Sequence, residues 1–194
     1  MKIIGLTGGT GSGKGVVSRL LFDMGAFIID SDKIAHDIIL KGKPAYNELV
    51  GYFGSSVLDG DGEIIRKKLG EIVFKDKGEK LDFLNSRTHK YIFEEISMEL
   101  KKAESEGKTA VIDAPLLLEG NFKSLCTEVW VVYADESTRL KRIIERDKID
   151  VEHGKNRIAS QKPWSYYESH ADVVIYNSGS IDDLKEQVYK YYKP

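Results

Sequence analysis

Cysteine is nearly absent from this sequence, because Cys126 is the one cysteine among 194 residues. An intrachain disulfide is therefore excluded. Leu125 and Val129 give Cys126 an apolar context, so we expect a core residue rather than a nucleophile.

The chain also lacks an excess of either charge and a long hydrophobic run. Its 29 basic and 31 acidic residues leave a net charge of −2, which argues against a general nucleic-acid or membrane binder but allows a local basic patch. No apolar run approaches the ~20 residues of a membrane span. Glycines interrupt the N-terminal apolar run Ile3–Leu6, unlike the run of a signal peptide. We expect a cytoplasmic protein.

The apolar residues that are present suit one compact α/β domain with insertions. A hydrophobic fraction of 41% excludes a disordered chain. Short apolar runs alternate with helical spacing, which predicts a parallel sheet with right-handed crossovers. The segment 79–106 fits either one long helix or a bent pair. The predicted strands lie at residues 3–6, 27–29, 109–112, 128–134 and 172–176.

The most informative stretch is GGTGSGKG, residues 8–15. A predicted strand enters it and a helix leaves it, the context in which G-x-x-x-x-G-K indicates a phosphate-binding loop. Glycines allow successive N–H groups to face phosphate oxygens, and the helix adds its positive N-terminal end. The residues predicted to bind ATP here are Gly9, Thr10, Gly11, Ser12, Gly13, Lys14, Gly15 and Val16.

One position of this motif departs from the pattern. The motif ends in Ser or Thr, whose hydroxyl binds magnesium, whereas this chain has Gly15. ATP binding is compatible with the change, but an intact magnesium shell is not.

Acidic residues follow two of the predicted strands. Asp30 and Asp32 lie at the end of the second strand, at the sheet edge where ligands bind in open α/β sheets. A helix cap is the alternative for either aspartate, and both interpretations can hold, one for each. Asp113 ends the third strand, where phosphate-loop proteins place a magnesium-shell carboxylate. Asp32 and Asp113 are therefore predicted magnesium ligands, through water.

Three arginines, Arg139, Arg142 and Arg146, are spaced so that they share one helix face. The alternative is a solvated helix with Glu145 and Asp147 as their partners. In a phosphate-binding protein, the pattern favours a closing lid that clamps phosphates.

The order and spacing of motifs along nearly the whole chain resemble the dephospho-coenzyme A kinase family. No single motif after the phosphate loop is decisive, but together they are specific. The residues that carry the resemblance are Gly5-Leu6-Thr7-Gly8-Gly9, Gly11-Ser12-Gly13-Lys14, Ile29-Asp30-Ser31-Asp32, Phe53-Gly54, Asp61-Gly62, Arg66, Leu84-Asn85, His89, Pro115-Leu116-Leu117, Glu119, Arg142, Arg146-Asp147, Arg157, Gln161, Ala171-Asp172 and Asn177.

The resemblance implies the fold of a phosphate-loop kinase: a five-stranded parallel sheet, a helical substrate-binding insertion and a lid. One unit would span residues 1–194. Within it, the core would comprise residues 1–59, 108–138 and 163–194, the substrate domain 60–107 and the lid 139–162. The implied reaction transfers the γ-phosphate of ATP to the ribose 3′-hydroxyl of dephospho-CoA, with Mg²⁺, in the last step of coenzyme A biosynthesis.

The resemblance also implies residue roles. Asp32 would be the catalytic aspartate, and Lys14, Arg142 and Arg146 would act on the phosphates. Asn177 and Arg142 would contact ATP. From the residue pattern alone, His89 is a structural histidine. The residues implied to bind substrate are Asp32, Arg66, His89, Pro115 and Leu116. Besides Gly15, Lys90 and Leu118 depart from the family pattern, as tolerated changes.

Three other classes of protein compete with this interpretation. Another small-molecule or nucleotide kinase would share the loop and lid. A regulatory GTPase would need an N-K-x-D guanine-binding motif, which the sequence lacks. A mechanical ATPase usually needs a larger chain and an arginine from a neighbouring subunit. We expect ATP and dephospho-CoA as partners, no nucleic acid, no membrane, and a monomer or weak homo-oligomer.

Overall fold

A computed structural model of the chain describes residues 1–75 and 78–192. The chain forms two compact units. We call Met1–Asp30 with Leu100–Pro194 the sheet unit, and Ser31–Glu99 the helical unit. No helix within the described residues is both long and apolar enough to cross a membrane.

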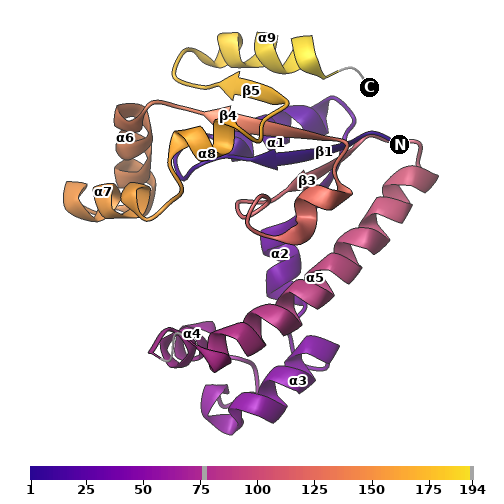
Figure 1. Ribbon diagram of the computed structural model, residues 1–194, viewed down its shortest axis with the longest axis vertical. Helices are drawn as coiled ribbons and strands as arrows, with labels where there is room; N and C mark the ends of the chain where they lie inside the picture. The colour runs from indigo at the N-terminus through magenta and orange to yellow at the C-terminus, as the bar shows by residue number, and fades with distance from the viewer. Residues whose placement is uncertain (76–77, 193–194) are drawn as a thin grey trace. The chain divides into compact units, whose positions relative to one another are not determined.

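The sheet unit contains the five-stranded parallel sheet that the sequence predicts (Figure 1). β1 occupies the middle, in the strand order β2-β3-β1-β4-β5, and every neighbouring pair is parallel. After β1 the chain crosses to β2 on one side of β1, and after β3 it crosses to β4 on the other side. The loop that follows β1 therefore lies at a switch point, where α/β sheets bind ligands. The strands are β1 Ile3–Thr7, β2 Phe27–Asp30, β3 Ala110–Asp113, β4 Glu128–Tyr133 and β5 Val173–Tyr176.

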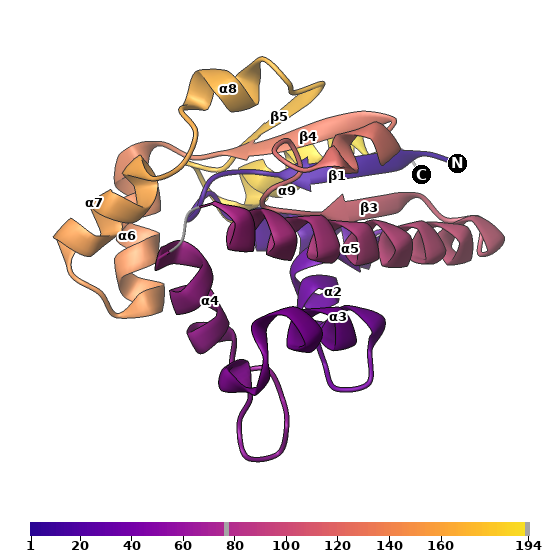
Figure 2. The same cartoon turned by 60° about the horizontal axis from the view of Figure 1, so that its bottom comes forward.

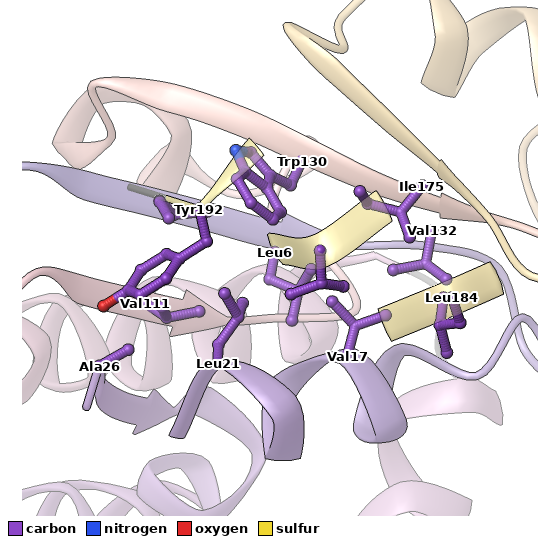
Figure 3. Close-up of a cluster of buried hydrophobic side chains, with 12 residues drawn as sticks. Leu6, Val17, Leu21, Ala26, Val111, Trp130, Val132, Ile175, Leu184 and Tyr192 are labelled. Carbon is purple, nitrogen blue, oxygen red and sulfur yellow. The ribbon is translucent and has the colours of Figure 1, made fainter. Parts of the chain in front are cut away.

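Two helices, α1 (Lys14–Asp23) and α9 (Ile181–Tyr191), pack together on one face of this sheet. Figure 3 shows the buried apolar cluster that joins them to the strands. It contains Leu6, Trp130, Val132 and Ile175 from the strands, Val17 and Leu21 from α1, and Leu184 and Val188 from α9. Because alternate strand residues point to opposite faces, Tyr133 faces away from Trp130 and Val132. Its ring contacts Trp164, with the ring centroids 4.4 Å apart.

Three α-helices of the sheet unit connect β4 to β5. Helices α6 (Glu136–Asp147) and α7 (Val151–Ala159) form a hairpin (Figures 1 and 2), and α8 (Trp164–Glu168) follows. Asp135 caps α6, because its carboxylate accepts the Thr138 N–H at 2.8 Å. Lys148, in the left-handed conformation with φ 54°, ends the helix and begins the turn to α7.

The helical unit consists of α2 (Ser31–Asp37), α3 (Pro44–Phe53), α4 (Arg66–Lys75) and most of α5 (Glu79–Ser105). Buried apolar residues on α3, α4 and α5, among them Leu49, Val73 and Ile96, form its interior. The segment that fitted one helix or a bent pair is the single helix α5.

The compact units divide the chain differently from the predicted segments. Residues 31–59, which we assigned to the core, belong with 60–99 to the helical unit, whereas 100–107 belong to the sheet unit. The assignment of 60–107 to substrate binding and of 139–162 to a lid stays a prediction.

Candidate active site

The phosphate loop connects β1 to α1 and is shaped by its glycines. Gly11 and Gly13 adopt φ 77° and 92°, in the left-handed region where residues with a Cβ are strained. Gly13 is the N-cap of α1, and helix geometry leaves the first N–H groups of α1, at Lys14 and Gly15, without an acceptor inside the helix. The loop thus offers the backbone donors and positive helix end that suit a polyphosphate.

Neighbouring groups approach the loop so closely that side chains are excluded. A Cβ on Gly8 would lie 2.6 Å from the Val132 carbonyl oxygen, and one on Gly9 would lie 2.7 Å from Nη2 of Arg139. A Cβ on Gly13 would overlap the amide of Asn177. Gly8, Gly11 and Gly13 are therefore required by packing as well as by backbone angles.

Lys14 forms an ion pair with Asp113 at the carboxyl edge of the sheet. Both side chains are largely buried, at 20% and 10% exposed. Asp30 is the register partner of Asp113 in the neighbouring strand β2. The structure thus brings the loop lysine and the predicted metal ligand Asp113 together, and the metal role of Asp113 stays a prediction.

Magnesium places modest demands on such a site. Within residues 1–75 and 78–192, no group of three or more His, Cys, Asp or Glu side chains is arranged to hold a metal. Magnesium keeps several waters and usually takes one or two carboxylates with substrate phosphates. The carboxylate of Asp113 beside the loop fits that requirement, with nucleotide phosphates and water completing the shell.

Asn177 contacts Ser12 of the phosphate loop. Asn177 is buried, and its Nδ2 donates to the Ser12 carbonyl oxygen at 2.7 Å. The Ser12 side chain is 1% exposed, and its Oγ has no hydrogen-bond partner among the described residues. Asn177 therefore supports the loop backbone. Its predicted contact with ATP is untested.

The three arginines that share one face of α6 have three different sets of partners. Arg139 donates from Nε to the Thr10 carbonyl oxygen at 2.9 Å. Nη1 of Arg142 lies 3.4 Å from the carbonyl oxygens of both Gly11 and Ser12. These two arginines reach the phosphate loop.

Arg146, the third arginine, is exposed and binds the Asp147 carboxylate through Nε and Nη2, at 2.8 and 2.9 Å. Asp147 also pairs with Arg157. Hydrogen bonding from Arg146 and the nearby arginine charges hold the pKa of Asp147 below its usual range. For Arg146 the structure shows the partner that the solvated-helix alternative named, and its catalytic role stays a prediction.

The contacts of Gln161 and Arg139 with Thr10 were not predicted from the sequence. The side-chain oxygen of Gln161 accepts the Thr10 N–H at 2.9 Å and Nη2 of Arg139 at 2.7 Å. The available signals were the place of Arg139 in the arginine series and the place of Gln161 in the family pattern. Neither signal indicated a contact with Thr10, about 130 to 150 positions away in sequence.

The other predicted site residues lie in both units. In the sheet unit, Pro115 and the exposed Leu116 follow β3, and the Pro115 carbonyl accepts the Thr7 hydroxyl at 3.2 Å. In the helical unit, Asp32 lies in the first turn of α2. Its i, i+4 spacing puts it on the same helix face as His36, whose Nδ1 is 3.3 Å from Nη1 of Arg66.

His89 lies on α5 of the helical unit and is exposed. The structure thus gathers the loop, Lys14, Asp113, Arg142 and Asn177 in the sheet unit, and Asp32 with Arg66 on neighbouring elements of the helical unit.

Comparison with known proteins identifies the family. A sequence model described as dephospho-CoA kinase matches residues 2–183. The chain belongs to the dephospho-CoA kinase family. Its sequence is 46% identical over 189 residues to the dephospho-CoA kinase of Carboxydothermus hydrogenoformans, covering 97% of this chain and 91% of the relative.

Solved structures agree with this assignment. The dephospho-CoA kinase from Campylobacter jejuni has a TM-score of 0.73 to this chain at 31% identity, covering 98% of this chain and 95% of the other. The protein TT1252 from Thermus thermophilus has a TM-score of 0.84 at 29% identity, covering 97% and 94%. The fold is therefore that of a phosphate-loop kinase.

The dephospho-CoA kinase family phosphorylates dephospho-CoA with ATP in the last step of coenzyme A biosynthesis, with Mg²⁺ as the usual metal ion. The chain is thus an ATP-binding transferase acting on small molecules. The rival classes of GTPase switch and mechanical ATPase are set aside.

Proposed function

We propose that the chain transfers the γ-phosphate of ATP to the ribose 3′-hydroxyl of dephospho-CoA with Lys14, Asp32, Arg142 and the loop N–H groups as its working groups. The observation that carries the proposal is the loop itself. Its glycines are closely surrounded, and it joins the central strand to a helix N-terminus with Lys14 at the start of that helix.

Lys14 changes partner when a nucleotide binds. Without one, its ammonium group is neutralised by Asp113. A polyphosphate brings several negative oxygens to the N-terminus of α1 and competes with the carboxylate for this charge. Lys14 and the loop N–H groups then hold the outer phosphates, since phosphoryl transfer depends mainly on positioning and electrostatic stabilisation.

Asp32 orients the acceptor hydroxyl or removes its proton, while Arg66, His89, Pro115 and Leu116 bind the rest of dephospho-CoA. The guanidinium of Arg66 lies beside His36 on α2. This position supports a role for Arg66 in binding phosphate in the helical unit. The alternative for Asp32 is stabilisation of the positive end of α2, and the experiment below separates the two.

The segment 139–162 acts as a lid. Arg142 offsets charge on the transferring group, and Arg146 joins it once Asp147 releases its guanidinium. Lid closure also excludes water that would otherwise accept the phosphoryl group. Bound magnesium supplies charge neutralisation at the phosphates, and Asp113 and Asp32 are its proposed protein ligands, through water.

We assign the enzyme to the cytoplasm as a monomer or weak homo-oligomer without nucleic-acid partners. The nearly balanced charge supports the last point.

Replacing the proposed base tests the mechanism. Asp32→Asn keeps the size and the capping ability but loses the charge, so kcat with dephospho-CoA should fall by about 10²–10⁴ while the Kd for ATP is little changed. Asp37→Asn, at the other end of α2, is the matched control and should keep its activity. A loss under about tenfold for Asp32→Asn would reduce Asp32 to a helix-start residue.

The acceptor is tested by assaying dephospho-CoA against AMP and adenosine. We expect a much lower kcat/KM for both alternatives. A nucleotide that proved the better acceptor would contradict the proposed reaction.

A further inference from the structure

The middle of the phosphate loop is enclosed by side chains from the two ends of the α6–α7 hairpin. Both backbone polar groups of Thr10 are used: the N–H donates to Oε1 of Gln161 at 2.9 Å, and the carbonyl accepts Nε of Arg139 at 2.9 Å. Nη2 of Arg139 donates to the same Oε1 at 2.7 Å. Three groups therefore close one ring of hydrogen bonds.

The ring joins three segments that are distant in the sequence. Arg139 lies in the first turns of α6, and Gln161 follows the end of α7. Because the two side chains also bind each other, movement of either end of the hairpin disturbs the hydrogen bonds of Thr10. The loop conformation and the position of the hairpin base are therefore linked.

The packing of Arg139 reaches the glycines on both sides of Thr10. Its guanidinium occupies the space next to Gly9, and its carbonyl oxygen lies 2.7 Å from where a Cβ of Gly11 would stand. The side chain is half-buried, and burial lowers the pKa of its guanidinium. A charge held partly out of water requires hydrogen-bond acceptors, and the Thr10 carbonyl and Gln161 provide them.

We propose that Arg139 and Gln161 are positioning residues that hold the phosphate loop in its ATP-binding shape before the nucleotide arrives. Flexible glycines would otherwise allow the loop many conformations, and ATP binding would have to order it. The ring fixes the backbone on one side of the loop, so that the N–H groups nearer α1 keep the orientation that receives phosphate. The proposal rests on the ATP-binding role of the loop.

Three variants separate the parts of the ring. Gln161→Ala removes the shared acceptor, and Arg139→Lys keeps the positive charge but loses the planar fork that reaches two oxygens. Gln161→Glu keeps an acceptor oxygen and should restore the ring. Arg19→Lys is the matched control for the arginine change, because Arg19 is an exposed residue of α1 whose ion pair is with Asp23.

The measurements are the Kd of a non-hydrolysable ATP analogue by calorimetry, the KM for each substrate, and hydrogen exchange of the Thr10 amide. Gln161→Ala and Arg139→Lys should raise the Kd of the analogue by about tenfold to a hundredfold, because a loop N–H or carbonyl loses its partner. The KM for dephospho-CoA should stay within about twofold, and Gln161→Glu within about threefold of the parent in both constants. The Thr10 amide should exchange faster in Gln161→Ala.

Three results would overturn the proposal. The first is a lower melting temperature with an unchanged Kd for the analogue, which a purely structural role predicts. The second is an equal weakening of the binding of both substrates. The third is a Gln161→Glu enzyme as defective as Gln161→Ala. If the parent enzyme itself failed to bind the analogue, the proposed function would fail instead, so the two failures are distinguishable.

Discussion

The two ends of the phosphate loop have opposite surroundings. Between Gly8 and Gly13, the glycines Gly8, Gly11 and Gly13 each face a backbone or amide group closer than a Cβ would tolerate, and Gly9 faces the guanidinium of Arg139. At the helix end, the position of a Cβ on Gly15 has no atom of the described residues within 4 Å, and Val16 beside it is 42% exposed. Glycine is therefore needed at one end of the motif and not at the other. Packing requires Gly8, Gly11 and Gly13, whereas nothing in the described fold requires Gly15.

The largest expected effect comes from filling the crowded end. Gly13→Ala puts a Cβ against the Asn177 amide at φ 92°, so we expect a loss of about 2–4 kcal/mol in the free energy of unfolding, or an ATP Kd raised by two orders of magnitude or so. Denaturant unfolding and calorimetry measure the two quantities.

Gly70→Ala is the control for that substitution. Gly70 lies inside α4 at a helical φ, and a Cβ there would lie at ordinary contact distance from the Phe74 ring. The Gly70→Ala substitution should raise the free energy of unfolding by about 0.5–1 kcal/mol. A Gly13→Ala enzyme that is as stable and as active as the parent would remove the contrast between the two ends of the loop.

A smaller effect is expected from two arginines of α6, of which Arg142 reaches the crowded end and Arg146 binds Asp147. Arg142→Ala should lower kcat by about 10- to 100-fold, because charge on the transferring group loses a partner. Arg146→Ala should also lower kcat, with little change in melting temperature, since an exposed ion pair adds little stability. Steady-state kinetics and thermal unfolding of both variants test this. A lowered melting temperature with an intact kcat would make these arginines structural ion-pair partners.

The smallest effect is expected at the open end. Gly15→Ser meets no neighbour among the described residues, and it should raise the free energy of unfolding slightly, by about 0.5 kcal/mol or less, because serine is a somewhat better helix former than glycine. A hydroxyl there can also bind magnesium, so the magnesium concentration for half-maximal rate at fixed ATP should fall. Thermal unfolding and a magnesium titration measure the two effects separately. An unchanged or higher magnesium requirement would show that the hydroxyl cannot reach the ion.

Much of the fold could be predicted because its signals are local. Short apolar runs such as 109–112 and 128–134 marked the buried strands. The spacing of the glycines and the lysine in residues 8–15 indicated phosphate binding. The shape of α5 could not be settled in this way, because polar residues interrupt its apolar face and only packing decides between a straight and a bent helix.

The partners of the site residues were harder to predict. Helical spacing put Arg139 and Arg146 on one face, yet it could not show that one binds Thr10 and the other Asp147. Asn177 was expected at the nucleotide, and its amide binds Ser12, 165 positions away. Such contacts depend on which segments the sheet order brings together, and the sequence pattern of a single segment does not contain that information.

The surroundings of Cys126 have a consequence for an enzyme whose product carries a free thiol. Burial raises the pKa of the Cys126 thiol to about 12, and its Sγ lies 3.4 Å from the Phe122 carbonyl oxygen. At neutral pH the reactive thiolate is then on the order of 10⁻⁵ of the population. Thiol–disulfide exchange needs an accessible thiolate, so coenzyme A in its oxidised form should not become attached to the protein. The thiol product and its disulfide should therefore react only slowly with Cys126 at neutral pH.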